Sequence, residues 1–89
     1  MISERLPIVN KLGLHARASA KLVELTRTFA ADIKIVKDGD AVDGKSILGL
    51  LMLAGACGES VEVRACGDDE AEAVTALRDL FARRFDEDD

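Results

Sequence analysis

The sequence has no tryptophan or tyrosine, and its 89 residues include only three phenylalanines, two cysteines, one histidine and one proline. Few aromatic rings leave few platforms on which bases could stack, and a net charge of −5 is opposite to the basic footprint that nucleic acid requires. Cys57 and Cys66 are too few for a disulfide framework or a cysteine-based metal site. These shortages disfavour nucleic-acid binding and predict a protein without a metal ion or another cofactor.

A long apolar segment is also missing. The longest stretch without a charged residue is residues 46–58, whereas a membrane-spanning helix needs roughly 20 apolar residues. Glu4 and Arg5 stand where the apolar part of a secretory signal would lie. We therefore expect no membrane insertion and a cytoplasmic location.

The remaining composition is that of a folded chain, with 48% hydrophobic and 33% charged residues. A chain of this length closes around one core, so residues 1–89 are expected to form a single domain. Most of the acidic surplus lies in residues 68–89, which contain nine acidic and three basic residues. We expect the terminal DEDD sequence, residues 86–89, to be a frayed and solvated tail.

Apolar residues recur with the period of a strand in some segments and with that of a helix in others. The predicted strands are residues 2–9, residues around Ile33 and Ile35, a short return strand at Val42 after an Asp-Gly hairpin, and residues 61–66. The predicted helices are residues 16–28, a short apolar helix capped by Ser46, and a helix from Asp68 or Asp69 that carries an apolar stripe to Phe85. Short connections and half-polar strands predict an α+β fold. We expect an open-faced β-sandwich with the element order βαββαβα. In this fold, three helices cover one face of a four-stranded, mainly antiparallel sheet.

The charge around the only histidine is opposite to that of the whole protein, because residues 5–23 contain four basic residues and no acidic one. His15 follows a glycine-containing turn and precedes a predicted helix, so backbone N–H groups and the positive helix end should lie near its ring. They favour the neutral, nucleophilic imidazole and would stabilise a phosphoryl group on it, with the Arg17 guanidinium as a further contact. The residues thus point to an anion site, with an ordinary exposed histidine as the alternative.

Three features together resemble the histidine-containing phosphocarrier family, HPr, of the bacterial phosphoenolpyruvate phosphotransferase system. They are GLHAR at residues 13–17, KSI at residues 45–47 before a Leu/Met-rich helix, and the order of strands and helices over essentially all 89 residues. The resemblance implies that His15 accepts a phosphoryl group on Nδ1 from Enzyme I and passes it to a IIA domain, with Arg17 as the phosphate partner. It also implies that Ser46 is the regulatory site of HPr kinase/phosphorylase.

One position departs from the family pattern. Ala18 stands where the family usually has proline, which should loosen the start of the helix slightly and leave His15 and Arg17 in place. The segments IVNKLGLHAR and LFARRFDEDD also resemble the nitrogen-related paralogue NPr, whereas Lys45-Ser46 favours ordinary HPr. A regulatory interaction module of the nitrogen-related branch is therefore a second hypothesis.

The apolar segment after Ser46 is hydrophobic on several sides. Either part of it stays exposed as a docking surface for protein partners, or all of it is buried against the sheet. The predicted docking residues are Ala16, Lys21, Ile47, Leu48 and Leu51. The expected partners are Enzyme I, IIA domains and HPr kinase/phosphorylase, and the protein is expected to be a monomer.

Residues 39–46, GDAVDGKS, match the phosphate-loop pattern of nucleotide-binding proteins literally. Asp40 and Asp43 would then face nucleotide phosphates, and Val42 is needed for the hairpin strand. The chain is also too short for the parallel sheet that would carry a second, magnesium-binding aspartate. Nucleotide binding is therefore disfavoured.

Overall fold

A computed structural model describes residues 1–87 of the chain. The strands are β1 (Ile2–Pro7), β2 (Asp32–Lys37), β3 (Asp40–Asp43) and β4 (Ser60–Cys66). The helices are α1 (Ala16–Thr26), α2 (Ile47–Leu53) and α3 (Glu70–Ala82), followed by a 3₁₀ turn, η1 (Arg84–Asp86). The predicted order of strands and helices is confirmed, but three elements end earlier than predicted. The first strand ends at Pro7 instead of residue 9, and the first helix at Thr26 instead of residue 28. The last helix ends at Ala82 and does not reach Phe85, because the backbone turns left-handed from Arg84.

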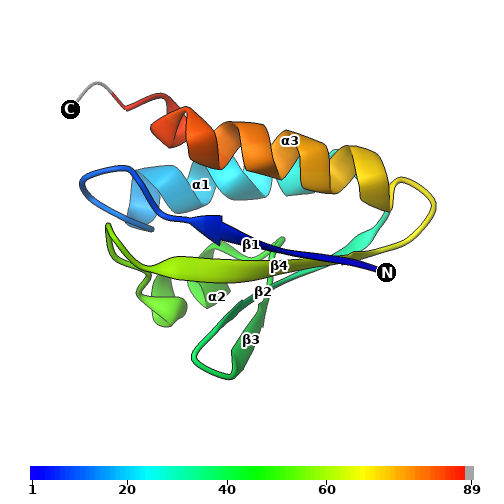
Figure 1. Ribbon diagram of the computed structural model, residues 1–89, viewed down its shortest axis with the longest axis horizontal. Coiled ribbons are helices and arrows are strands. Elements are labelled where there is room, and N and C mark those ends of the chain that lie inside the picture. Colours follow the sequence, from blue (N-terminus) through cyan, green and yellow to red (C-terminus); the bar gives the residue numbers. More distant parts are fainter. Residues whose placement is uncertain (88–89) are drawn as a thin grey trace.

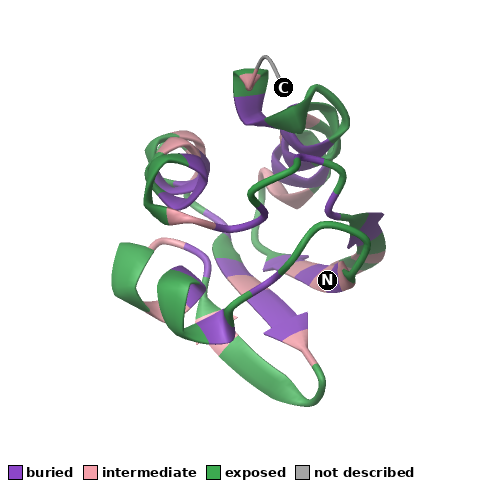
Figure 2. Cartoon of the chain, turned by 90° about the vertical axis from the view of Figure 1, so that its left-hand side faces the viewer, coloured by how far each residue is buried: buried purple, intermediate pink, exposed green. Residues whose placement is uncertain are grey.

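The four strands form one sheet in the order β1-β4-β2-β3, and each neighbouring pair is antiparallel. In the register, Val63 of β4 lies between Glu4 of β1 and Ile35 of β2, and Ile35 also lies opposite Val42 of β3. The helices lie together on one side of this sheet, with α1 and α3 side by side (Figures 1 and 2). The predicted open-faced sandwich is therefore confirmed.

The hydrophobic core lies between the sheet and the helices, because alternate strand residues point to the helical face. In β4, Val61, Val63 and Ala65 are fully buried, whereas the residues between them are half-buried. Leu22 of α1 and Leu77 of α3 are fully buried in the same cluster. Each such aliphatic side chain contributes about 1.5–3 kcal/mol by leaving water.

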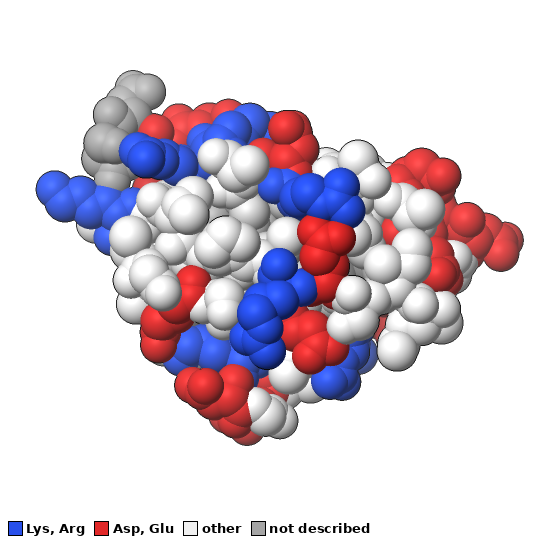
Figure 3. All heavy atoms as spheres, in the orientation of Figure 1, with Lys and Arg blue, Asp and Glu red and all other residues white. Residues whose placement is uncertain are grey.

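The surface seen in Figure 3 mixes basic and acidic side chains and has no continuous basic area. Ion pairs between partly exposed side chains include Arg64 with Glu62 (2.8 Å) and Arg78 with Glu4 (2.6 Å). Among residues 1–87, no helix combines the length and the apolar character needed to cross a bilayer.

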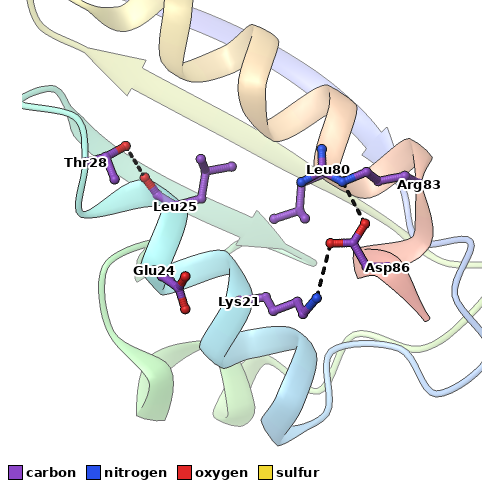
Figure 4. A pocket seen from close by; sticks show the side chains of 7 residues that line it. All are labelled: Lys21, Glu24, Leu25, Thr28, Leu80, Arg83 and Asp86. Atoms are coloured by element: carbon purple, nitrogen blue, oxygen red, sulfur yellow. Dashed lines mark hydrogen bonds and ion pairs between the residues drawn. The ribbon is translucent and has the colours of Figure 1, made fainter.

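The C-terminal segment differs from the predicted frayed tail. After α3, residues Arg84, Phe85 and Asp86 all have left-handed backbone conformations, with φ of 58°, 54° and 62°. The Phe85 side chain is buried and lies against Phe81, with ring centroids 4.9 Å apart. Asp86 binds Lys21 of α1 at 3.1 Å and Arg83 at 2.9 Å (Figure 4).

The prediction of a frayed tail is therefore wrong for residues 86 and 87, because a buried ring and ion pairs hold this end of the chain against α1. The other two residues of that predicted tail, 88 and 89, lie outside the described residues.

Candidate functional site

A short loop before α1 fixes the approach to the histidine. The amide N–H of Gly13 donates to the Asn10 carbonyl (3.1 Å), and Leu14 N–H donates to the carbonyl of Gly55, just after α2 (2.9 Å). Gly13 has a φ of +64°, and a Cβ on it would lie 2.4 Å from the Gly55 oxygen. Glycine is therefore required here both by the backbone conformation and by the close approach of the two loops.

His15 is the N-cap of α1, as its place in the sequence predicts. Its backbone is extended (φ −76°, ψ −179°), and its carbonyl accepts the first helical hydrogen bond, from Ser19 N–H at 2.9 Å. The imidazole does not cap the helix, and the first turn contains no acidic residue. The backbone N–H groups at the start of α1 are therefore left to interact with solvent or an anion.

The imidazole of His15 is in contact with the opposite end of the chain. Nε2 of His15 pairs with a carboxylate oxygen of Glu87, and the other carboxylate oxygen accepts a hydrogen bond from Asn10 Nδ2 at 3.1 Å. The His15 side chain is 27% exposed and that of Glu87 only 10%. Within residues 1–87, no hydrogen-bond partner contacts Nδ1 of His15.

Glu87 places a negative charge next to His15, although residues 5–23 around this histidine in the sequence contain no acidic residue. Burial of the carboxyl opposes ionisation, but hydrogen bonds from His15 and Asn10, together with the charges of His15 and Arg17, lower the pKa of Glu87 below its usual value. The carboxylate is therefore ionised at neutral pH. Sequence analysis missed this residue, because a contact across 72 positions leaves no local pattern.

Arg17 and Lys21, the two basic residues of α1 nearest to His15, have different surroundings. Arg17 is exposed, close enough to influence Glu87 electrostatically, and forms no ion pair with the described residues. Lys21 is 40% exposed and binds Asp86 at 3.1 Å. Arg17 is thus close to the carboxylate that binds His15, whereas Lys21 already has a partner of opposite charge.

The start of α2 is capped in the way predicted from the sequence. The Ser46 hydroxyl accepts a hydrogen bond from Gly49 N–H at 3.1 Å. Near it, Lys45 Nζ donates to the Phe29 carbonyl at 2.8 Å, beyond the C-terminal end of α1. Because His15 lies at the other end of this 11-residue helix, about 16 Å away along its axis, Ser46 is not part of the histidine site.

The helix α2 buries only part of its apolar surface. Leu50 and Leu53 are buried, so the alternative of complete burial is wrong for the rest of the helix. We refer to the four exposed apolar side chains as the α2 patch. They are Ile47 (41% exposed), Leu48 (67%), Leu51 (38%) and Met52 (75%). The hydrogen bond from Leu14 to Gly55 links the end of this helix to the loop before His15.

The segment that matches a phosphate-loop pattern has a structural role in the described chain. Val42 belongs to β3, and the Asp43 carboxylate accepts a hydrogen bond from Lys45 N–H at 2.9 Å. The Lys45 ammonium and the Ser46 hydroxyl are engaged by Phe29 and Gly49. The groups that would hold phosphates in a nucleotide site are therefore used to join β3 to α2.

A cleft of about 290 Å³ lies between α1 and α3, beside the C-terminal turn (Figure 4). Its lining residues are Lys21, Glu24, Leu25, Thr28, Leu80, Arg83 and Asp86. Asp86 joins Lys21 of α1 to Arg83 at the end of α3, so both basic residues that line the cleft are already paired. Residues 1–87 contain no group of three histidine, cysteine or acidic side chains placed to hold a metal ion.

The chain is similar in sequence to known proteins over almost its whole length. The family described as PTS HPr component phosphorylation site matches residues 2–83. Phosphocarrier protein HPr of Cupriavidus necator is 48% identical over 87 residues, which are 98% of each chain. Phosphocarrier protein NPr of Escherichia coli K12 is 42% identical over 88 residues, again 98% of each.

Solved structures show the same fold. The crystal structure of HPr-C-His from Thermoanaerobacter tengcongensis has a TM-score of 0.95 and 41% identity, and the match covers 99% of both chains. A crystal structure of an HPr dimer from the same organism has a TM-score of 0.79 over 98% of this chain and 100% of that one. The family match contains His15, Arg17 and Ser46 and ends before Glu87.

Proposed function

We propose a function for this chain from the premise that it belongs to the HPr family of phosphocarrier proteins. His15 accepts a phosphoryl group and passes it on, as a single-domain carrier of the phosphoenolpyruvate phosphotransferase system. The observation that supports this most directly is the state of the histidine. Its Nε2 is paired, its Nδ1 has no partner among the described residues, and it stands at a helix start without a capping side chain.

The surroundings of His15 contain groups that would stabilise a phosphoryl group on its ring. A phosphohistidine carries negative charge, which the N–H groups at the start of α1 stabilise through hydrogen bonds and the helix dipole. The Arg17 guanidinium, two residues further on, offers donors in the geometry that fits phosphate oxygens. No activating base is needed, because the neutral imidazole has a lone pair of its own.

The proposed donor is Enzyme I and the proposed acceptor is a IIA domain. Both would dock on Ala16 and on the α2 patch, because exposed apolar surface beside a reactive group is typical of a protein interface. Lys21 joins the proposed docking surface although it is paired with Asp86, since an ion pair this exposed contributes little and can be exchanged for one with a partner.

Ser46 is the proposed regulatory site, modified by HPr kinase/phosphorylase. Its hydroxyl accepts a hydrogen bond from Gly49 N–H, so a phosphate there would sit at the start of α2, where negative charge is tolerated. The charge would adjoin the α2 patch and change the surface that partners meet. This regulation would thus act on docking, because Ser46 and His15 lie at opposite ends of α1.

A second candidate is a regulatory interaction module of the nitrogen-related branch, favoured by the 42% identity to NPr. Such a protein would bind its partners through the same surface, with His15 rarely phosphorylated. Replacing His15 by alanine separates the two functions. A carrier variant loses all phosphoryl transfer, whereas a regulatory variant keeps its partner binding.

The decisive experiment measures intact mass after incubation with Enzyme I, magnesium and phosphoenolpyruvate. We expect the wild-type protein to gain one acid-labile phosphoryl group and His15→Ala to gain none. A wild-type protein that gains no phosphoryl group under conditions that load an authentic HPr would contradict the carrier function. Light scattering on the same samples tests the proposed monomeric state, and cell fractionation tests the proposed cytoplasmic location.

A further inference from the structure

We propose that Glu87 is a positioning residue for His15, whose carboxylate keeps the ring proton on Nε2 and so directs the lone pair of Nδ1 to the incoming phosphoryl group. This inference rests on the proposed phosphocarrier function and deepens it. Glu87 lies outside the residues 2–83 matched by the family. The inference therefore concerns a part of the site that the family match does not contain.

The carboxylate of Glu87 is held from two sides. One oxygen meets Nε2 of His15, and the other accepts from Nδ2 of Asn10 at 3.1 Å. Asn10 is fully buried, and the same Nδ2 also donates to the Gly13 carbonyl at 2.7 Å. An ionised carboxylate can only accept hydrogen bonds, so Nε2 must be the donor. In the neutral imidazole the lone pair is then on Nδ1.

The chain places Glu87 at the ring by a turn that is held in three ways. The left-handed residues Arg84, Phe85 and Asp86 form a tight turn after α3, at a cost of about 1–2 kcal/mol for each residue. The buried ring of Phe85 and the bonds from Asp86 to Lys21 and Arg83 offset that cost. A strained turn that persists at a reactive residue indicates that the position of Glu87 matters.

The electron balance of the transfer shows what the carboxylate contributes. When the carrier is loaded, the Nδ1 lone pair forms the bond to phosphorus, and the bond from phosphorus to the donor atom breaks with its electron pair staying on that atom. The proton remains on Nε2, so the ring of the product carries positive charge beside the Glu87 carboxylate. When the group is passed on, the N–P bond breaks and its electron pair returns to Nδ1. No proton has to leave the site in either step.

The first measurement is the ¹⁵N NMR spectrum of the unphosphorylated His15 ring at neutral pH. In the wild-type protein we expect a protonated Nε2 and an unprotonated Nδ1. In Glu87→Ala we expect the two tautomers to become mixed. Glu72→Gln, which changes an exposed acidic residue near the start of α3, is the matched control and should leave the ring signals unchanged.

The second measurement is the rate of phosphoryl gain from Enzyme I, magnesium and phosphoenolpyruvate. We expect Glu87→Ala to load roughly five- to tenfold more slowly, because one charge-assisted hydrogen bond to the reacting ring is lost. Glu87→Asp keeps the charge on a shorter side chain and should recover part of the rate. A thermal melt of each variant checks that the fold is intact.

The outcomes separate this inference from the proposed function. If Glu87→Ala loads at the wild-type rate with unchanged ring signals, the positioning role is wrong and the carrier function stands. If the rate falls but the ring signals do not change, Glu87 does not act through the tautomer, and the inference is also overturned. If the wild-type protein gains no phosphoryl group at all, it is the proposed function that fails.

Discussion

The helices α1 and α3 begin in opposite ways, although both pack on the same sheet. The first turn of α3 contains Glu70 and Glu72, and the Glu70 carboxylate accepts a hydrogen bond from Gly67 N–H at 3.0 Å. The first turn of α1 has no acidic residue, and its N-cap His15 makes no capping bond. The N-cap of α3, Asp69, makes no side-chain capping bond either, so the two helix starts differ in charge: α3 has negative side chains of its own there, and α1 has none.

The contrast shows how a helix start can serve stability or binding. Acidic side chains near a helix start typically contribute 0.3–1 kcal/mol each through the helix dipole. The start of α1 lacks this stabilisation. The loop before it is held instead by the close contact of Gly13 with Gly55 and by the pairing of His15 with Glu87. Substitutions at one helix start at a time should therefore have different effects on stability and on phosphoryl transfer.

Gly13→Ala should have the largest effect on stability, because it disrupts the close contact between Gly13 and Gly55 that holds the loop before α1. The new Cβ would lie 2.4 Å from the Gly55 oxygen at a φ of +64°. We expect a loss of about 2–4 kcal/mol in the free energy of unfolding, measured by denaturant titration. Gly39→Ala is the control, since Gly39 also has a positive φ but no atom within 4 Å of a Cβ. It should cost only about 1 kcal/mol, and equal losses would refute the role of the contact.

Ala16→Glu would give α1 the kind of residue with which α3 begins. We expect phosphoryl acceptance to fall on the order of 30-fold, because the carboxylate would compete with the phosphoryl group for the same N–H groups. The melting temperature should stay the same or rise slightly. Ala20→Glu, also exposed on α1 but beyond its first turn, is the control and should keep most of the rate. A similar loss in both variants would show that the helix start is not special.

The contribution of Asp69, just before α3, to the stability of the fold should depend on pH. Its carboxylate accepts hydrogen bonds from Ala30 and Ala31 N–H at 2.8 Å each. The first of these bonds is the largest cause of the lowered pKa of Asp69, and burial of the carboxyl opposes it. A lowered folded-state pKa means that the stabilisation is present above the usual value of 3.8 and is lost as the pH falls through the folded value.

Asp69→Asn should therefore lower the melting temperature at neutral pH, and the difference from wild type should shrink under strongly acidic conditions. Asp68→Asn is the matched control, because the exposed Asp68 makes no such bond among the described residues. A difference that stays constant across the pH range would contradict the assignment to the carboxylate. Phosphoryl acceptance by His15 should be unchanged in both variants.

Ser46→Ala should have the smallest effect, because it removes the one side-chain cap of a short helix. We expect a loss of about 1 kcal/mol in the free energy of unfolding, since Gly49 N–H loses its acceptor. Ser46→Asp should keep most of that stability, because aspartate also caps helices. If both variants lose the same stability, the hydrogen bond to Gly49 is not the cause.

Features set by neighbouring residues could be predicted from the sequence. The periods of the apolar residues indicate the strands and helices, and the Asp-Gly pair indicates the hairpin between β2 and β3. His15 could be placed at a helix start because the turn before it and the apolar stripe after it are both local. Ser46 could be predicted as an N-cap for the same reason.

Features that depend on distant contacts could not be predicted. Glu87 reaches His15 through three left-handed residues, none of which is glycine, so no turn pattern marks the change of direction. The one available signal is Phe85, which extends the apolar stripe beyond the end of α3. In α2, Leu48 and Leu50 look equivalent in the sequence, yet one is exposed and the other buried, because only packing against α1 and β3 distinguishes them.

The hydrogen bond between Leu14 and Gly55 has a consequence for the kinetics of encounter. It fastens the loop that carries His15 to the end of the helix that carries the α2 patch. A protein that binds this patch therefore meets the imidazole at a fixed separation, and the collision between the two reacting groups becomes an intramolecular event. Within that complex, the rate of transfer depends on the effective concentration of the reacting groups, which rigid attachment raises. A carrier built in this way can exchange its group in brief and weak encounters.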